Sequence, residues 1–254
     1  MSDLVGEGDI VMMVVPSESH APKGQLHAFR SQILRECLDL GCLPMVVRET
    51  ELPLAMTALT RPPALVIADT ASFDRMTRIV PPDIALTSLE ILAARQKGNL
   101  GEFVAAIRTA GHLRPGDRVL LAEGCSHRPY HEETANERIP VFLRTLVGGP
   151  LRIDRARGDE FPDTLRGYHL VVHCGACCLS RKEMLRRQAI GRRDGVPVIN
   201  YALLSTYVNH TLSRALAPLR QNGALGAEID DLIDLGRPAG PQRNAGKARA
   251  LQTS

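Results

Sequence analysis

The chain has 254 residues, of which 44% are hydrophobic and 23% charged, as in soluble globular proteins with one large domain or two small ones. Aromatic residues make up only 4% and Trp is absent, which argues against a platform for stacking nucleic-acid bases. The formal net charge of +3 comes from segment 237–254, which has four basic residues and no acidic one. The rest of the chain has 27 basic and 28 acidic residues and is therefore nearly neutral. We therefore expect no nucleic-acid partner, and we interpret this segment as a solvated end.

Neither membrane insertion nor secretion is indicated by the sequence. No apolar run approaches the roughly 18 residues that a membrane span requires. The N-terminus MSDLVGEGD lacks the basic and apolar regions of a signal peptide. The six cysteines include a cluster, which fits a reduced compartment and a metal or redox site better than a disulfide framework. We therefore expect a cytoplasmic protein without a membrane partner.

Strand-like and helix-like segments alternate from the N-terminus, which predicts an α/β fold with parallel sheets. In the first pass, the expected strands are 10–15, 44–47 and 64–68. The helices between and after them are expected at 25–40, 52–59 and 72–79. Two consecutive helices, 88–95 and 100–110, then form a bridge to the second half.

The same alternation returns in the second half of the chain. Strands are expected at 118–122, 151–154, 168–173 and 196–199. Helices are expected at 139–147, 180–194 and 202–217. We therefore predict two consecutive parallel-sheet α/β units, a small one at 8–90 and a larger one at 91–220. Because Gly, Pro and charged residues dominate from residue 222 onward, we expect a flexible basic tail at 221–254.

Cysteines follow two of the expected strands. Cys125 comes after strand 118–122, and Cys174 opens the sequence CGACC directly after His173. Ligands of open parallel sheets collect at the carboxyl ends of strands, so these two segments can converge on one crevice. Cys177 lies just before a capping-box pattern, and a helix amino terminus there would favour the thiolate form that binds metals.

The C-x-x-C spacing alone fits a redox disulfide, half of a zinc site or part of an iron-sulfur site. The upstream sequence CSHRPYHEE adds possible ligands at Cys125, His127, His131 and Glu132. Three cysteines can hold three irons of a cubane cluster and leave the fourth iron to another ligand. An iron-sulfur site is favoured, while a Cys3His zinc site, thiol redox chemistry and inert cysteines stay open as alternatives.

The pattern C-x-H, then 45 residues, then H-C-x-x-C resembles the cluster motif of HydF, the GTPase scaffold that matures FeFe-hydrogenase. The resemblance spans residues 8–218. Its flanking segments include VVPSESHAPKGQLHAFR (14–30), LTSLEILAARQKGNLGEFV (86–104), YHLVVHCGACCLSRKEMLRR (168–187) and GVPVINYALL (195–204).

The resemblance implies that the first unit dimerises and that the second binds a 4Fe-4S cluster. Cys125, Cys174 and Cys177 match the three thiolate ligands. For the variable fourth ligand the resemblance favours Glu132, with His131 and His127 as competitors. It also suggests that His127, His131 and His173 line the pocket for the cargo, although a lone His is more often an ordinary hydrogen-bonded residue. Cys37, Cys42 and Cys178 are interpreted as small buried residues.

The implied function is that of a scaffold and carrier. Such a protein receives a diiron subcluster precursor bearing CO and cyanide from radical-SAM maturases and delivers it to apo FeFe-hydrogenase. The given sequence contains no G-x-x-x-x-G-K-S/T loop, so GTP hydrolysis is not assigned to it. The GTPase is then either a domain of a longer form of this protein or a separate polypeptide that acts as a partner. We expect a homodimer and no enzymatic activity of the chain itself. The alternatives are an iron-sulfur electron-transfer protein, a thiol redox protein and a structural zinc protein.

Overall fold

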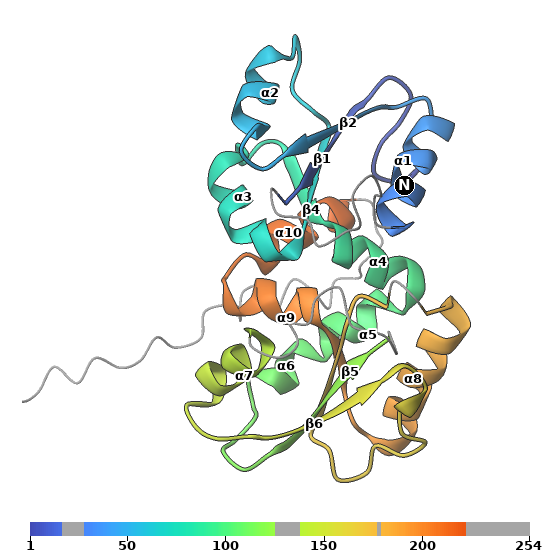
Figure 1. Ribbon diagram of the computed structural model, residues 1–254, viewed down its shortest axis with the longest axis vertical. Coiled ribbons are helices and arrows are strands. Elements are labelled where there is room, and N and C mark those ends of the chain that lie inside the picture. The colour runs from blue at the N-terminus through green and yellow to red at the C-terminus, as the bar shows by residue number, and fades with distance from the viewer. Residues whose placement is uncertain (17–27, 125–137, 177–178, 222–254) are drawn as a thin grey trace, which may run out of the picture.

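The computed structural model of the protein describes residues 1–16, 28–124, 138–176 and 179–221. These residues form two parallel sheets of four strands each, with orders β2-β1-β3-β4 and β6-β5-β7-β8. The two sheets and their helices lie one after the other along the long axis of the molecule (Figure 1). The predicted fold class, two consecutive parallel-sheet α/β units, is confirmed.

The first unit is built around a central apolar strand. Its strands are β1 Ile10–Val15, β2 Leu43–Arg48, β3 Leu65–Ala68 and β4 Ala85–Ser88. Its helices are α1 Ala28–Asp39, α2 Leu52–Ala58 and α3 Phe73–Ile79, with a short 3-10 turn η1 at Thr70–Ser72. The strands β1 and β3 are almost wholly buried, as continuous apolar runs in parallel sheets usually are, whereas β2 lies at an edge and is largely exposed.

Strand β4 is a correction to the three strands expected in this unit. Its sequence ALTS carries two hydroxyl side chains, which do not resemble a core strand. Both hydroxyls have partners inside the fold: Thr87 Oγ1 donates to the carbonyl of Ala215 (2.8 Å), and Ser88 Oγ accepts from the amide of Ile91 (3.1 Å). Ser88 thereby caps α4 Leu89–Lys97, the first of the two predicted bridging helices.

The second unit repeats the arrangement with a larger set of helices. Its strands are β5 Arg118–Glu123, β6 Arg152–Arg157, β7 Leu170–His173 and β8 Val198–Asn200. Its helices are α5 Leu100–Ala105, α6 Ile107–Ala110, α7 Ile139–Val147, α8 Arg181–Asp194, α9 Tyr201–Val208 and α10 Leu212–Gln221, with a 3-10 turn η3 at Gly158–Glu160. Within the described ranges, no helix combines the length and apolar character needed to cross a bilayer.

The last helices connect the second unit back to the first. The sequence predicts one helix over 202–217, but the chain turns at His210, which has a φ of 56°, and α10 begins only after this turn. Arg214 of α10 donates to the carbonyls of Pro81 and Ile84, both at 2.6 Å, next to the start of β4. The helix α10 therefore packs against β4 of the first sheet.

Candidate metal centre

The candidate site lies at the carboxyl edge of the second sheet, where the ends of three neighbouring strands coincide. The register pairs Ala122 of β5 with His173 of β7, and His173 with Asn200 of β8. The residues that follow, Glu123, Cys174 and Tyr201, therefore come at the same level across the sheet. Ligand sites of open parallel sheets are found at this edge.

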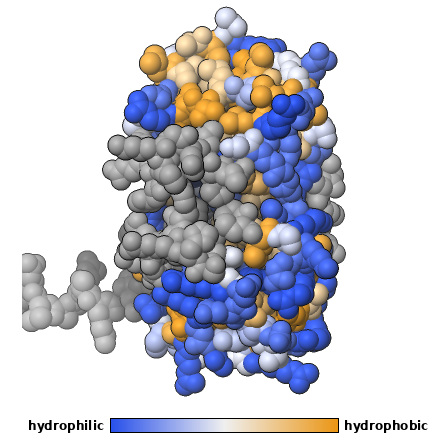
Figure 2. Space-filling model, turned by 45° about the vertical axis from the view of Figure 1, so that its right-hand side comes forward, coloured by the Kyte–Doolittle hydropathy of each residue, from blue (hydrophilic) through white to orange (hydrophobic). Residues whose placement is uncertain are grey.

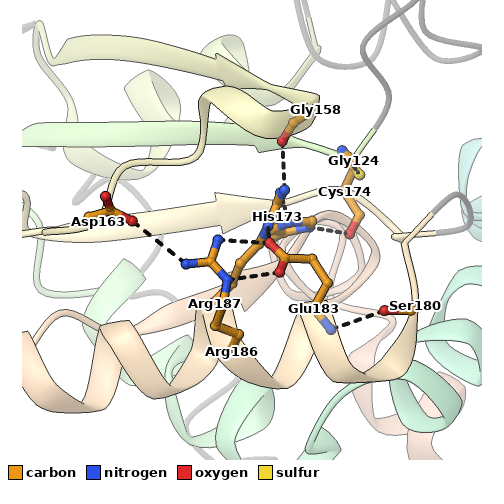
Figure 3. Close-up of polar contacts among 9 residues, drawn as sticks. All are labelled: Gly124, Gly158, Asp163, His173, Cys174, Ser180, Glu183, Arg186 and Arg187. Carbon is orange, nitrogen blue, oxygen red and sulfur yellow. Dashed lines mark hydrogen bonds and ion pairs between the residues drawn. The ribbon is translucent and has the colours of Figure 1, made fainter.

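The sulfur of Cys174 is surrounded by backbone donors. The amide of Gly124 donates to Cys174 Sγ at 3.1 Å (Figure 3). The amide of Ala176 donates to the same sulfur at 3.4 Å. Ala176 adopts a φ of 56°, a left-handed conformation that curls the loop back on the sulfur. Amide donors favour a negatively charged sulfur, which is the form that binds metal ions.

Gly124 needs to be a glycine at this position. A Cβ added there would lie 2.9 Å from Cγ of Leu179, closer than Cβ atoms normally approach. The close approach brings the end of β5 against the loop after β7. It also allows the Gly124 amide to reach the Cys174 sulfur.

His173 is fully buried and both of its ring nitrogens have partners in the chain. Nε2 lies 3.0 Å from Nη1 of Arg187, and Nδ1 lies 2.9 Å from the carbonyl oxygen of Cys174 (Figure 3). A guanidinium can only donate, so Nε2 accepts, and Nδ1 carries the proton that is donated to the carbonyl. Burial, and after it the charge of Arg187, lowers the pKa of His173 to about 4. His173 is therefore a neutral residue that anchors the Cys174 backbone.

Arg187 is buried behind His173 and makes three further contacts. Nε donates to Glu183 (2.9 Å), Nη2 donates to the carbonyl of Gly158 (2.6 Å), and the guanidinium lies 4.7 Å from the centre of the Phe161 ring. Glu183 sits in the first turn of α8, where its amide donates to the Oγ of the capping Ser180 (3.2 Å).

Two cations keep Glu183 ionised. Its hydrogen bond with Arg186, and next that with Arg187, lowers the pKa of Glu183 to about 2. The chain of contacts from Glu183 through Arg187 to His173 thus joins the start of α8 to the end of β7. Arg187 is the cation that connects them.

The backbone carbonyl of Cys174 receives a second hydrogen bond from β8. Nδ2 of the buried Asn200 donates to it at 3.4 Å, while Oδ1 of Asn200 accepts from the amide of Ala202 (2.7 Å) and caps α9. His173 and Asn200 together hold the peptide group after Cys174. The cysteine therefore has a fixed backbone at the edge of the sheet.

The loop that follows Cys174 also contacts the bridging helix α4. A Cβ built on Gly175 would lie 3.7 Å from Cγ of Glu90. The carboxylate of Glu90 in turn accepts from the amide (2.9 Å) and the hydroxyl (2.7 Å) of Thr70, at the start of η1. The candidate site is thus connected through α4 to the first unit.

Only two of the seven predicted site residues, Cys174 and His173, lie within the described ranges. The others are outside the described residues: Cys125, His127, His131, Glu132 and Cys177. Within the part of the chain that the structure describes, no three His, Cys, Asp or Glu side chains are arranged to hold a metal ion. The described residues Gly124 and Ala176, which immediately precede Cys125 and Cys177 in the sequence, both donate to Cys174 Sγ.

Sequence reasoning missed Arg187, Asn200 and Tyr201 at this edge. Arg187 belongs to a strongly basic helix that suggests an exposed face, yet it is buried on the side that also carries Met184 and Gln188. The helical spacing of three and four residues from Met184 and Glu183 is the signal that could have identified it. For Asn200, the signal is a capping residue at the end of an apolar strand.

Similarity to solved structures is distant. A maleate isomerase from Pseudomonas putida S16, solved with maleate, has 11% identity and a TM-score of 0.35 over 79% of this chain and 90% of that one. The shikimate dehydrogenase of Mycobacterium tuberculosis has 12% identity and a TM-score of 0.32 over 90% of this chain and 98% of that one. Such likenesses identify no function.

Family models match almost the whole described part of the chain, while no curated protein sequence matches it significantly. The model of the hydrogen maturase F dimerization domain matches residues 1–98. The model of the hydrogen maturase F tetramerization domain matches residues 101–218. Both matched domains are named for self-association, and their order is that of the two sheets. The chain belongs to the hydrogen maturase F (HydF) family.

Proposed function

We propose that this protein is a scaffold and carrier in the maturation of FeFe-hydrogenase, with a 4Fe-4S cluster held at the carboxyl edge of its second sheet. The observation that carries the proposal is the sulfur of Cys174, which accepts two backbone amides, one from each segment that leads into a further cysteine. Membership of the HydF family supports the biological role. The cluster itself is inferred from the donor set.

The residues around Cys174 suit an iron-sulfur cluster. Cys174, with Cys125 and Cys177 from the sequence, supplies three thiolates, the number that binds three irons of a cubane. The amides on Cys174 Sγ are donors of the kind that tune such sulfurs. Tyr201, next to Asn200, has a buried hydroxyl for which the described residues offer no hydrogen-bond partner. Three thiolates, two backbone amide donors and the Tyr201 hydroxyl suit an iron-sulfur cluster, because the sulfur atoms of such a cluster accept hydrogen bonds.

Each described residue has a definite task in this proposal. Cys174 binds iron, and the amides of Gly124 and Ala176 stabilise its negative charge. His173 and Asn200 fix the Cys174 carbonyl and so fix the direction from which the thiolate approaches. The bound cluster would supply an iron whose fourth ligand can be exchanged. The candidates for that ligand stay Glu132, His131 and His127.

The cargo is the diiron subcluster precursor with its CO and cyanide ligands. In this role the chain accepts the precursor from radical-SAM maturases and passes it to apo FeFe-hydrogenase, without chemical turnover of its own. His127 and His131 are proposed to line the position of the cargo.

Anaerobic reconstitution with iron and sulfide tests the proposal. We expect about four irons and four sulfides per chain, with an EPR signal after reduction. The Cys125→Ser and Cys174→Ser variants should lose this content, and Cys178→Ser, which changes the neighbouring thiol, should retain it. A redox-active C-x-x-C dithiol would depend only on Cys174 and Cys177. A Cys125→Ser variant that keeps full thiol–disulfide exchange activity would therefore favour the redox alternative. Tightly bound zinc without iron after anaerobic purification would refute the proposal.

The fourth ligand requires a separate test. Glu132→Ala should keep the cluster but change its EPR spectrum or its binding of an exogenous ligand. The His131→Ala variant is the matched comparison. An unchanged spectrum in Glu132→Ala together with a changed one in His131→Ala would assign the ligand to the histidine.

We also infer that the first unit forms a homodimer. Leu38, Leu43, Val46 and Leu54 are exposed by 43–72% on α1, β2 and α2, and β2 is the edge strand of its sheet. Figure 2 shows apolar side chains gathered at the end of the molecule that this unit forms. An apolar face beside an unpaired strand edge is stabilised when a second copy covers it.

Sedimentation of a charged variant tests the dimer. Leu43→Asp should shift the protein toward the monomer, because burying the new carboxylate at the interface is costly. Val141→Asp changes an exposed apolar residue of the second unit and should leave the dimer intact. A dimer that persists in Leu43→Asp at low concentration would contradict this interface.

A further inference from the structure

Tyr201 carries the least satisfied polar group at the candidate site. It is the first residue of α9 and is only 7% exposed. Its hydroxyl oxygen is fully buried and has no hydrogen-bond partner among the residues that the structure describes. Buried hydroxyl groups are nearly always hydrogen-bonded, so a hydroxyl without a partner at the edge of a ligand site requires an explanation.

The sheet register places Tyr201 at the same strand-end level as Cys174. In the sheet register, Tyr201 follows Asn200 of β8 as Cys174 follows His173 of β7. Burial raises the pKa of Tyr201 well above its ordinary value, and the negative forms of Cys174 and Glu123 raise it further, while Arg155 and Arg157 oppose them. A phenol hydroxyl carries a proton that it can donate.

The polar neighbours of Tyr201 at this edge already have partners. Glu123 accepts from Nε of Arg157 (2.9 Å). Both side-chain atoms of Asn200 are used, one on the Cys174 carbonyl and one on the Ala202 amide. Among the described residues, no group accepts a hydrogen bond from the Tyr201 hydroxyl. A cluster bound at Cys174 would bring sulfur acceptors to this edge.

We propose that the Tyr201 hydroxyl donates a hydrogen bond to a sulfur atom of the cluster bound at Cys174 and raises its reduction potential. The inference rests on the proposed function, because it requires that cluster. A donor beside cluster sulfur stabilises the additional electron of the reduced state, and hydrogen bonds to the sulfurs are among the factors that set the potential. Tyr201 is not a ligand and is not needed for iron to bind.

The test compares Tyr201→Phe with Tyr207→Phe after anaerobic reconstitution. Tyr207 is the matched control because it lies on the same helix and its hydroxyl lies near Gly111, at the end of α6. Both variants should hold the wild-type iron and sulfide content. The Tyr201→Phe cluster should be harder to reduce, with a roughly tenfold lower ratio of reduced to oxidised cluster at a fixed potential, or about 59 mV for one electron.

Two further measurements separate hydrogen bonding from a structural role. An exchangeable proton coupled to the reduced cluster, measured by ENDOR in water and in deuterium oxide, should be present in the wild type and in Tyr207→Phe and absent in Tyr201→Phe. The apo form of Tyr201→Phe should unfold at the same temperature as the wild type or higher, because the variant removes an unsatisfied hydroxyl. A structural hydroxyl would lower that temperature and leave the proton coupling in place.

The possible failures are distinguishable. If the wild type binds no iron, the proposed function is wrong and the inference is wrong with it. If the wild type holds its cluster and Tyr201→Phe has the same potential and the same proton coupling, the inference alone is overturned. Loss of iron from a folded Tyr201→Phe would also overturn it. If Tyr201→Phe does not fold, difluorotyrosine at position 201 replaces it, because this residue keeps the ring and has a stronger donor hydroxyl. The difluorotyrosine variant should raise the reduction potential of the cluster. An unchanged potential would refute the inference.

Discussion

Replacing Arg187 by Met should destabilise the second unit strongly, although the change preserves much of the side-chain volume. The guanidinium is 1% exposed and donates to Glu183, His173 and the carbonyl of Gly158. Methionine can fill the space against Phe161 but cannot donate. The two acceptors that are themselves buried, on His173 and Gly158, would lose their donor.

The magnitude follows from these three contacts. Each buried acceptor left without a donor costs about 1–3 kcal/mol. The loss at Glu183 adds little, because that side chain is 29% exposed and keeps its partner Arg186. Part of the cost is offset because the desolvation of a buried guanidinium is no longer required. We therefore expect a net destabilisation of about 2–4 kcal/mol.

Urea unfolding of the apo protein measures this effect. With a slope of about 2 kcal/mol per molar, the midpoint should fall by about 1–2 M. The control is Arg186→Met on the same helix, which removes a 47% exposed arginine that also contacts Glu183 and should cost less than about 1 kcal/mol. Equal effects of the two substitutions would refute the assignment of Arg187 as the buried link between α8 and His173.

Two other predictions concern acid stability and the contact between the units. Glu183 has a lowered pKa, so its stabilising contribution is complete above its ordinary pKa of 4.5 and is lost as the pH falls toward about 2. The difference in urea midpoint between wild type and Glu183→Gln should therefore shrink between pH 5 and pH 3, and a constant difference would contradict this. Thr87→Val removes the hydrogen bond to the Ala215 carbonyl and should cost about 1–3 kcal/mol in thermal unfolding, whereas Thr57→Val, at an exposed hydroxyl, should cost less than about 0.5 kcal/mol. Equal losses in the two threonine variants would show that the contact of β4 with α10 contributes little.

The strands with continuous apolar sequences could be predicted because burial on both faces of a parallel sheet leaves a clear signal. The run Ile10–Val15 is such a case, and its bounds agree with the structure. Strand β4 had no such signal. Its hydroxyl groups are satisfied by Ala215, 128 residues away from Thr87, and by the start of α4, and the first of these partners cannot be inferred from the local sequence.

The ligand chemistry of the candidate site could be predicted from the sequence, but the hydrogen bonds that hold the site in place could not. Cys174 could be assigned to a strand end because it follows the apolar run of β7. His173 looked like a residue that faces the cargo, and whether it does so stays a prediction. Its hydrogen bonds to Arg187 and to the Cys174 carbonyl depend on how α8 packs, which sequence spacing does not determine.

Infrared spectroscopy tests most directly whether the protein is a scaffold that accepts the diiron precursor. The wild type, with its cluster reconstituted, is incubated with the radical-SAM maturases and then reisolated. We predict CO and cyanide stretching bands on the wild type and on Cys37→Ser, a change at a buried cysteine of the first unit, and no bands on Cys174→Ser. A wild-type protein that holds its cluster but never acquires these bands would contradict the account.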